Sequence, residues 1–352
     1  MDITEFDKNF LQAAAGGKKV EFHDALEAPF ALDGFPFRQP GEKLSRLPAG
    51  LTEQTFSPGV HALAGNTSGG AIRFRAASPE LYLMAAPAST AAMRHMPATG
   101  VSGYDFYYRD ADGRWKFLKN AAANGLDPEK SAAIPARAEM TDYMLVLPLY
   151  SGVEKIFIGT VPGAALEPPT PYAIRDNLCF YGSSITQGGC ASRPGNSYTA
   201  MLARELDAPQ VNLGFSGSAR GETALAALIA RIPMALFVYD YDHNAPDADF
   251  LRATHAPFFR AIRAARPEVP VIMLSGCSRC EDARRDIIRQ TYLDAVSGGD
   301  KKVWFIDGAS LFREAGQEYC TVDGIHPNDL GFYMMFRTIL PVAREALKTA
   351  NG

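Results

Sequence analysis

The sequence predicts an α/β protein in two parts, a β-sandwich followed by a parallel β-sheet flanked by helices. Three observations carry this prediction. Short strand-like runs separated by turn residues fill about residues 50–165, a proline-rich stretch follows, and strand-like and helix-like segments then alternate to the C-terminus. A chain of 352 residues is also longer than one typical domain, which favours two separate cores.

The composition excludes several classes of protein. With 47% hydrophobic and 21% charged residues, the chain has the composition of a globular protein. The net charge of -4 comes from mixed signs, without the basic stripe that binds a phosphate backbone, so we expect no nucleic-acid partner. No segment has the roughly 20 apolar residues that span a bilayer, and residues 1–8 lack the features of a signal peptide. We therefore expect no membrane partner and a cytoplasmic location, although a chain trimmed of a leader would look the same.

The cysteines do not form the pattern of a disulfide framework, because their number is odd and their spacing uneven. We expect free thiols. Cys277 and Cys280 form a single C-x-x-C motif with no second pair at zinc-finger spacing, so we expect no metal and no cofactor. The five cysteines are Cys179, Cys190, Cys277, Cys280 and Cys320.

The first part of the chain has the pattern of an antiparallel sandwich. Residues 71–75 alternate apolar with charged side chains, as a half-buried strand does. Residues 110–114, Asp-Ala-Asp-Gly-Arg, are typical of a hairpin turn. Many short strands with turns between them indicate a β-sandwich. Further strands are expected at residues 80–84, 106–108, 143–147 and 155–158.

Residues 162–171 are expected to be a linker. Their core, Glu167-Pro168-Pro169-Thr170-Pro171, cannot continue a helix or a central strand, because each proline fixes φ and lacks an amide proton. The predicted domains are therefore a sandwich at residues 1–170 and a second domain at residues 171–352.

After this linker the period of the hydrophobic pattern changes. Strict alternation of strand and helix implies right-handed βαβ units and a parallel sheet covered on both faces. We expect strands at residues 177–181, 211–215, 235–239, 270–274 and 303–306, and helices at residues 197–206, 222–229, 250–265, 282–295 and 329–347.

Ligands of such a sheet bind beyond the carboxyl ends of the strands, so polar residues there are the candidates. Gly182 and Ser184 follow the first strand, and a glycine ahead of a serine at a strand-to-helix turn presents the hydroxyl in the crevice. Gly217 follows the second strand with an N–H that can face developing negative charge. Asn244 follows the third strand, and its amide can supply a second donor.

The last loop carries a carboxylate and an imidazole. Asp323 and His326 lie three residues apart ahead of the final helix, with Pro327 locking the turn. This spacing lets the carboxylate bind one imidazole nitrogen while the other faces a nucleophile. The remaining histidines are expected to pack or to hold loops: His23, His61, His95, His243 and His255.

The order of these strand-end residues resembles the four sequence blocks of the GDSL, or SGNH, hydrolase family, over about residue 176 to the C-terminus. The resemblance implies a flavodoxin-like sheet with Ser184 as the nucleophile. It further implies His326 as the base, oriented by Asp323. The backbone N–H groups of Ser184 and Gly217 and the amide of Asn244 would then form the oxyanion hole.

Two blocks depart from the family pattern. The first is Gly-Ser-Ser where Gly-Asp-Ser is usual, and the third, at residues 242–245, is Asp-His-Asn-Ala where Gly-x-Asn-Asp is usual. The catalytic identities stay in place, but the branch and the substrate are open. Residues 103–107, Gly-Tyr-Asp-Phe-Tyr, look like the GxDLY motif of a β-sandwich, jelly-roll-like domain that precedes one SGNH branch.

The resemblance to carbohydrate esterases implies a serine esterase that hydrolyses short-acyl, above all O-acetyl, esters of an oligosaccharide or small molecule. Acyl transfer to a hydroxyl acceptor would use the same triad. A metallophosphoesterase built on Asp240, Asp242 and His243 with the last loop would explain neither Ser184 nor Gly217. A non-catalytic sugar-binding protein is disfavoured by the complete Ser, Asp and His set.

Other polar and aromatic residues near these motifs allow two interpretations. They could contact substrate, but residues of these types in such places more often pack, cap a helix or lie on the surface. They are Trp115, Arg193, Asn196, Arg220 and Glu222.

Overall fold

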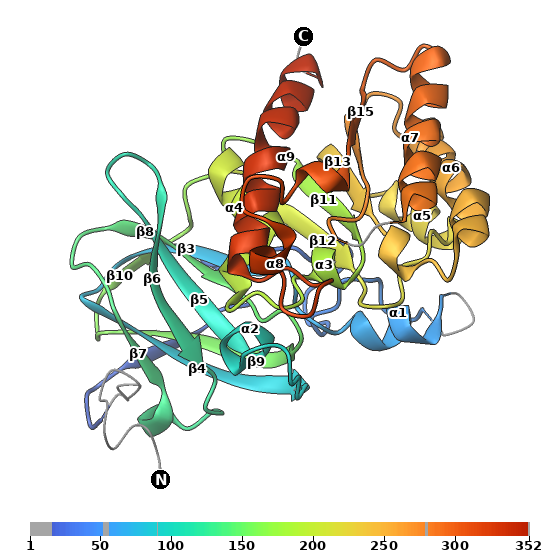
Figure 1. The fold of residues 1–352 in the computed structure, drawn as a ribbon. Coiled ribbons are helices and arrows are strands. Elements are labelled where there is room, and N and C mark those ends of the chain that lie inside the picture. The colour runs from blue at the N-terminus through green and yellow to red at the C-terminus, as the bar shows by residue number, and fades with distance from the viewer. Residues whose placement is uncertain (1–15, 52–55, 90, 279–280, 351–352) are drawn as a thin grey trace.

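Figure 1 shows the computed structural model, which describes residues 16–51, 56–89, 91–278 and 281–350. Residues 1–8 and Cys280, on which two of the expectations rest, lie outside the described residues. The chain forms two antiparallel sheets in its first half and one parallel sheet with helices in its second half (Figure 1). The predicted class, a parallel sheet flanked by helices and preceded by a β-sandwich, is confirmed.

The two antiparallel sheets pack face to face. Their shared core contains the buried inward side chains of both sheets, among them Phe74, Leu83 and Phe106. The first sheet has the order β1 (Glu21–Asp24), β9 (Gly152–Thr160), β4 (Glu80–Ser89), β7 (Ala132–Pro135). The second has the order β10 (Ala165–Glu167), β3 (Ala71–Ala77), β8 (Thr141–Val146), β5 (Gly103–Arg109), β6 (Trp115–Ala122), and β2 (Ala31–Asp33) also pairs with β3.

Two details of the sandwich differ from the sequence prediction. The expected linker contains β10, which pairs antiparallel with β3, because residues 165–167 precede the prolines and have free amide protons. Arg73, expected on a solvated face, is buried: its Nε binds Asp33 at 2.8 Å, and its guanidinium lies 3.5 Å from the ring centroid of Tyr172. The outer face of this sheet is covered because the second half of the chain packs on it.

The parallel sheet has the strand order 2-1-3-4-5 of a flavodoxin-like fold. Its first strand is buried on both faces: Cys179 and Tyr181 point into one core, and Leu178 and Phe180 into the other. The strands in spatial order are β12 (Gln210–Gly214), β11 (Asn177–Gly182), β13 (Met234–Asp240), β14 (Val271–Leu274) and β15 (Val303–Ile306).

Helices cover both faces of this sheet. The longer ones are α5 (Thr223–Ile229), α6 (Ala248–Ala265) and α7 (Asp282–Ser297) on one face, and α4 (Tyr198–Leu206) and α9 (Asp329–Ala350) on the other. Short helices lie in the connections: α1 (Pro58–Leu63), α2 (Ala98–Val101), α3 (Ser184–Gln187) and α8 (Gln317–Cys320). None of the described helices is long and apolar enough to cross a bilayer.

The two halves share more than one covalent connection. Leu47, Phe56 and Val60 precede most of the sandwich in sequence, yet their side chains complete the core on the α5–α6–α7 face of the parallel sheet. A domain boundary at residue 170 therefore stays a prediction. On the other side, Arg109 of β5 forms an ion pair of 2.9 Å with Asp207, which ends α4.

The short helix α3 approaches β12 so closely that only glycine fits. A Cβ at Gly214 would lie 2.2 Å from the backbone nitrogen of Gln187 in α3. Because the neighbour is backbone rather than a flexible side chain, the two elements would have to move apart.

We therefore expect Gly214→Ala to lower the free energy of unfolding by about 1–3 kcal/mol, the range for overpacking a dense core. Gly65→Ala is the matched control, since a Cβ at Gly65 meets nothing within 4 Å. Urea titration followed by circular dichroism measures both. Equal stability of the two variants would contradict the close packing of α3 on β12.

Candidate active site

The parallel register brings three strand ends together. Gly182, at the end of β11, pairs with Gly214 of β12 and with Asp240 of β13. The Phe215 N–H continues the ladder by donating to the Gly182 carbonyl at 2.9 Å. The residues that follow these strands therefore start from one level of the sheet, although more than 50 positions separate the first from the third.

Ser184 is the first residue of α3, directly beyond β11. Ser183 caps this helix: its Oγ accepts from the Ile185 N–H at 3.1 Å. The Ser184 carbonyl accepts from the Gly189 N–H at 2.7 Å and from the Tyr150 hydroxyl at 3.4 Å. The backbone on both sides of the Ser184 hydroxyl is thus fixed, while the residue keeps 9% of its surface exposed.

The predicted triad residues lie in contact. Ser184 Oγ is 2.9 Å from His326 Nε2, and His326 Nδ1 is 2.7 Å from an oxygen of Asp323. Burial favours the neutral acid at Asp323, but the hydrogen bonds from the backbone and ring of His326 and from the Ile325 N–H outweigh it and lower the pKa of Asp323 to about 2. An ionised carboxylate only accepts, so Nδ1 carries the ring proton and Nε2 accepts from Ser184.

Local hydrogen bonds shape the loop that carries Asp323 and His326. The Val322 N–H donates to the His326 carbonyl at 2.9 Å, and Gly324 adopts a φ of 85°, which favours glycine. The Ser278 hydroxyl donates to the Ile325 carbonyl at 2.7 Å. The loop is therefore anchored at its base and at its tip.

The predicted oxyanion donors lie on the two neighbouring strand ends. Gly217 has a φ of 66°, a conformation that favours glycine. A Cβ there would meet nothing within 4 Å, so the space beside Gly217 is open. Asn244 donates from Nδ2 to the Phe215 carbonyl at 3.0 Å, which leaves one amide hydrogen free. Among the described residues, neither the Ser184 nor the Gly217 N–H has an acceptor.

Asp240 supports the nucleophile turn rather than its own loop. It accepts hydrogen bonds from the Thr186 hydroxyl, from the Tyr198 hydroxyl at 3.2 Å and from the backbone of Ser183. Burial raises the pKa of Asp240 to about 7. The hydrogen bonds favour the ionised form, but the effect of burial is larger. A Cβ at Gly182 would lie 1.9 Å from this carboxylate, so Gly182 is needed for space.

The residues that would form a metallophosphoesterase site bind different partners instead of one common point. Asp242 accepts from the Gly276 N–H at 2.8 Å and from the His243 N–H at 3.0 Å, whereas Asp323 faces His326. Within the described ranges, no three His, Cys, Asp or Glu side chains are grouped as a metal site would require. Cys277 is free, and burial raises its pKa.

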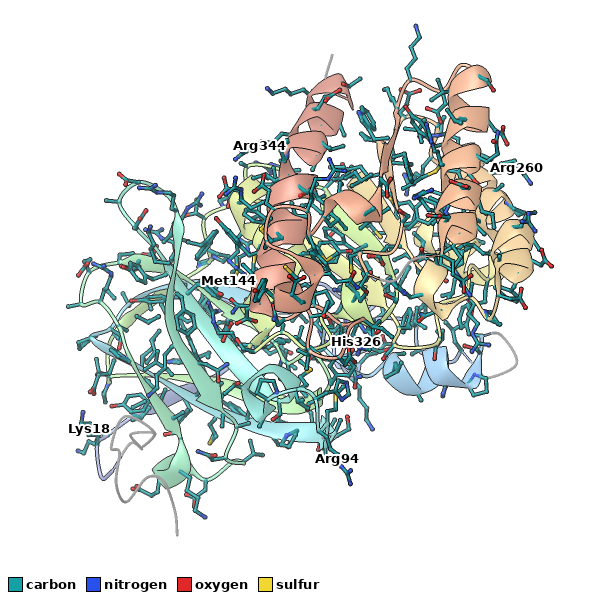
Figure 2. The ribbon with its side chains drawn as sticks, in the orientation of Figure 1. Lys18, Arg94, Met144, Arg260, His326 and Arg344 are labelled. Atoms are coloured by element: carbon teal, nitrogen blue, oxygen red, sulfur yellow. The ribbon has the colours of Figure 1, made fainter. Side chains whose placement is uncertain are left out.

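The position of His95 near the candidate triad was not predicted from the sequence. A structural role for His95 stays a prediction, and its ring centroid lies 5.8 Å from that of His326. Figure 2 shows His326 where the two halves of the molecule meet, on the side where Arg94 projects from the loop after β4. This proximity could not be predicted from the sequence, because His95 has no motif around it.

The sandwich also orders the segment that follows α3. Asp105 is fully buried in β5 and accepts from Arg193 at 2.8 Å and from the Gly195 N–H at 2.9 Å. One residue earlier, Ser192 donates its N–H at 2.8 Å to Asp329, at the start of α9 and three residues after His326. A chain of contacts therefore connects the GxDLY-like aspartate to the loop of the catalytic histidine candidate.

The polar residues for which the sequence allows either a substrate contact or a structural role bind neighbouring loops. Arg193 binds Asp105 and the Tyr107 hydroxyl, and Asn196 donates to Asp329 at 2.8 Å. Glu222 accepts from the Tyr181 hydroxyl at 3.0 Å and from the Arg220 N–H at 3.1 Å. Trp115 is partly buried against the outer face of the second antiparallel sheet.

Two more residues of the first half support the strand ends. Arg46, with no exposed surface, donates to the carbonyls of Asn212 at 3.2 Å and Gly214 at 2.6 Å, and its guanidinium lies 4.5 Å from the ring centroid of Phe215. Ser68 donates to the Gln187 carbonyl at 2.6 Å. The Gln187 side chain in turn accepts from the Ser216 N–H at 3.0 Å, next to Gly217.

The two halves of the chain match two different families of known proteins. Residues 175–344 match the GDSL-like lipase/acylhydrolase family, and residues 20–166 match the GxDLY family, the N-terminus of SGNH-hydrolase-type esterases. The chain belongs to the SGNH, or GDSL-like, hydrolase family. The family explains why the Ser, Gly, Asn and Asp-x-x-His blocks occur in this order at successive strand ends. A comparison with curated protein sequences gave no match.

Solved structures similar to this SGNH hydrolase include both esterases and an acyltransferase. A protein of Bacteroides ovatus described as a GDSL-like lipase is 27% identical, with a TM-score of 0.82, over 94% of this chain and 98% of that chain. A salicylyl-acyltransferase from a tetracycline biosynthetic pathway is 18% identical, with a TM-score of 0.77 and the same coverage. An acetyl xylan esterase of the rumen bacterium Butyrivibrio proteoclasticus is 12% identical, with a TM-score of 0.60, over 94% and 99%.

The contact between Asp105 and Arg193 yields a test of the coupling between the two halves. We expect Asp105→Asn to lower the free energy of unfolding by about 3–5 kcal/mol, because the asparagine no longer neutralises the charge of the Arg193 guanidinium. Thermal unfolding followed by circular dichroism measures the change. In the double variant Asp105→Asn/Arg193→Gln the loss should be smaller than the sum of the two single losses. Strict additivity would show that the two side chains do not interact.

Proposed function

We propose that this SGNH hydrolase is a serine esterase that removes short acyl groups, O-acetyl above all, from carbohydrates through an acyl-enzyme intermediate. The observation that carries the proposal is the relay of 2.9 Å from Ser184 to His326 and 2.7 Å from His326 to Asp323. A serine hydroxyl is a weak nucleophile near neutral pH and has to lose its proton as it attacks. This relay offers a base in hydrogen-bond contact with the hydroxyl.

In the proposed acylation step, Ser184 is the nucleophile and His326 is the base. Ser184 Oγ forms a bond to the ester carbonyl carbon while its proton passes to His326 Nε2. Asp323 stabilises the resulting imidazolium through Nδ1 and, with its lowered pKa, stays ionised. When the tetrahedral intermediate collapses, the C–O bond to the alcohol breaks, and His326 returns the proton to the leaving oxygen.

Deacylation reverses the roles. A water molecule gives a proton to His326 Nε2 and attacks the acyl carbon, and the bond to Ser184 Oγ then breaks as Ser184 recovers a proton from His326. The carboxylic acid is released. In both halves of the reaction the carbonyl oxygen becomes negative, and the free N–H groups of Ser184 and Gly217, with the second amide hydrogen of Asn244, are the candidate donors.

The carbohydrate part of the proposal rests on similarity and on the surroundings of the site. Acetyl xylan esterase and family two carbohydrate esterases, one in complex with cellohexaose, share the fold. Polar side chains lie next to the loop of His326: Ser278 donates to the Ile325 carbonyl and Gln317 to the Gly324 carbonyl.

Replacement of the nucleophile is the first test. We expect Ser184→Ala to lower turnover of p-nitrophenyl acetate and of acetylated oligosaccharides by at least about 10⁴-fold, the scale seen when a triad member is removed. Ser297→Ala, at the exposed end of α7, is the control and should retain wild-type turnover. Release of p-nitrophenol and of acetate gives the rates. Wild-type turnover by Ser184→Ala would eliminate the mechanism.

The oxyanion donor has a separate signature. Asn244→Ala should lower kcat by about 10²–10³-fold with little change in KM, because the amide binds charge that develops only in the transition state. Asn124→Ala, in the sandwich, serves as the control. If KM rises while kcat stays constant, Asn244 binds the substrate in its ground state and the donor assignment is wrong.

Acyl transfer is a second candidate, favoured by the similarity to the salicylyl-acyltransferase. The same acyl-enzyme would be resolved by a hydroxyl acceptor in place of water. Product analysis separates the two, since hydrolysis yields one acetate for each alcohol released, whereas transfer yields acylated acceptor and little acetate. We expect hydrolysis to predominate when sugars are supplied as acceptors.

A further inference from the structure

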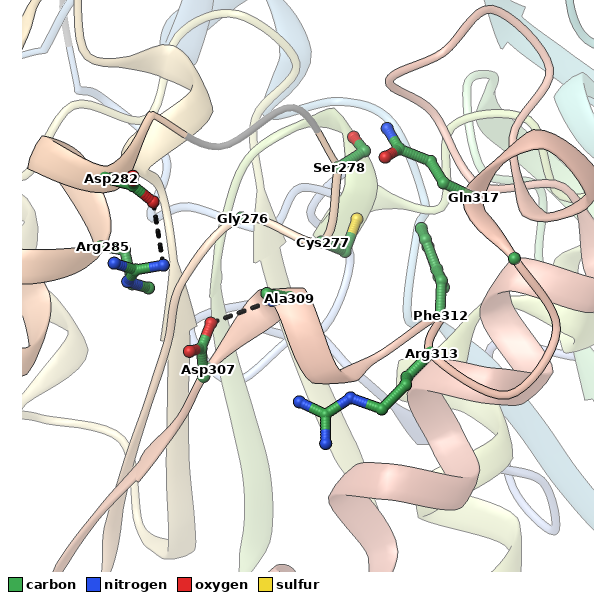
Figure 3. Close-up of a pocket in the computed structure, with 11 residues that line it drawn as sticks. Gly276, Cys277, Ser278, Asp282, Arg285, Asp307, Ala309, Phe312, Arg313 and Gln317 are labelled. Carbon is green, nitrogen blue, oxygen red and sulfur yellow. Dashed lines mark hydrogen bonds and ion pairs between the residues drawn. The ribbon is translucent and has the colours of Figure 1, made fainter.

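A cavity of about 410 Å³ lies beyond the carboxyl ends of β14 and β15, and Figure 3 shows the side chains around it. It lies at the same edge of the sheet as Ser184, Gly217 and Asn244, and β14 is the strand next to β13, which precedes Asn244. None of the residues of the triad or of the oxyanion donors lines it. Its volume is within the range of small-molecule sites and suffices for one or two sugar rings.

Hydrogen bonds connect the cavity wall to the active-site loops. Ser278 and Gln317 line the cavity and donate to the carbonyls of Ile325 at 2.7 Å and Gly324 at 3.4 Å, both between Asp323 and His326. Gly276, which also lines the cavity, donates its N–H at 2.8 Å to Asp242, two residues before Asn244. The cavity thus adjoins both the loop of the imidazole and the loop of the amide.

The charges that line the cavity balance. Asp282, Arg285, Asp307 and Arg313 contribute two negative and two positive groups. Arg285 forms ion pairs with Asp282 at 2.9 Å and with Asp286 at 3.3 Å, whereas the guanidinium of Arg313, an exposed residue, has no hydrogen-bond or ion-pair partner within the described part of the chain. Asp307 accepts from the Ala309 N–H with one oxygen at 3.0 Å, and its other oxygen accepts no hydrogen bond from a described residue. Unused donors and an unused acceptor therefore face one space (Figure 3).

The geometry points to a subsite for a neutral polyhydroxylated ligand, namely the sugar unit next to the acylated one. A sugar hydroxyl both donates and accepts, so it satisfies an arginine and a carboxylate that lie close together. An anionic ligand would be repelled by the free oxygen of Asp307, and a fatty acyl chain would cover Asp307 and Arg313 without giving either a hydrogen-bond partner. This inference rests on the proposed function, because it assigns the alcohol side of the same ester.

Kinetics with two classes of ester test the subsite. Arg313→Ala removes the unpaired guanidinium, and Asp307→Asn keeps the oxygen that caps the Gly308–Ser310 turn while replacing the free one. We expect each to lower the ratio of kcat/KM on the best acetylated oligosaccharide to that on p-nitrophenyl acetate by about tenfold, through KM, as loss of one hydrogen bond to a charged group does. Arg260→Ala, exposed on α6, should keep the wild-type ratio. The panel comprises acetylated xylo-, gluco- and mannooligosaccharides.

Binding without turnover provides a second measurement. Calorimetry with Ser184→Ala and the same intact acetylated oligosaccharide should give a Kd that rises about tenfold when Arg313→Ala is added. An unchanged Kd, or an unchanged ratio in the kinetic assay, would overturn the subsite while leaving the esterase in place. If wild type cleaves p-nitrophenyl acetate through Ser184 but no member of the panel, both the subsite and the carbohydrate substrate are wrong. Activity that survives Ser184→Ala contradicts the proposed mechanism itself.

Discussion

The close packing of α3 against β11 and β12 fixes the position of Ser184, and the rest of the site is arranged around it. A Cβ at Gly182 would collide with Asp240, and one at Gly214 would collide with the backbone of α3. Without side chains at these two positions, the helix that begins at Ser184 lies directly on the sheet. Asp240, buried behind the turn, binds the Ser183 backbone and the Thr186 hydroxyl, so the turn is held from below as well as from its sides.

The first half of the chain supplies the remaining support. Arg46 binds the carbonyls at the end of β12, Ser68 binds the carbonyl of Gln187, and Tyr150 binds the carbonyl of Ser184 itself. Asp105 orders the segment after α3, and this segment contacts Asp329 near His326. These contacts come from several positions along the first half of the chain. The first half of the chain therefore acts as a scaffold for the active-site loops.

The sequence was sufficient to predict the parallel sheet and the grouping of its strand ends. Hydrophobic periodicity placed β11 to β15, and parallel strands necessarily place Ser184, Gly217 and Asn244 at one edge. The short spacing of Asp323 and His326 likewise encodes their contact locally. What depended on contacts between distant segments was missed: the proximity of His95 to His326, the burial of Arg73 and the partners of Asp105. β10 was missed because the prolines that follow it dominated the pattern.

The burial of Asp105 has a consequence for how such a protein can evolve. An aspartate with no exposed surface, whose partners include a backbone amide and an arginine of the other half, ties the inheritance of one half to that of the other. Recombination that exchanged the sandwich for an unrelated module would strand Arg193 and Gly195 without an acceptor. We therefore expect the two halves to be inherited together, or the sandwich to be replaced only by a module that brings an equivalent carboxylate.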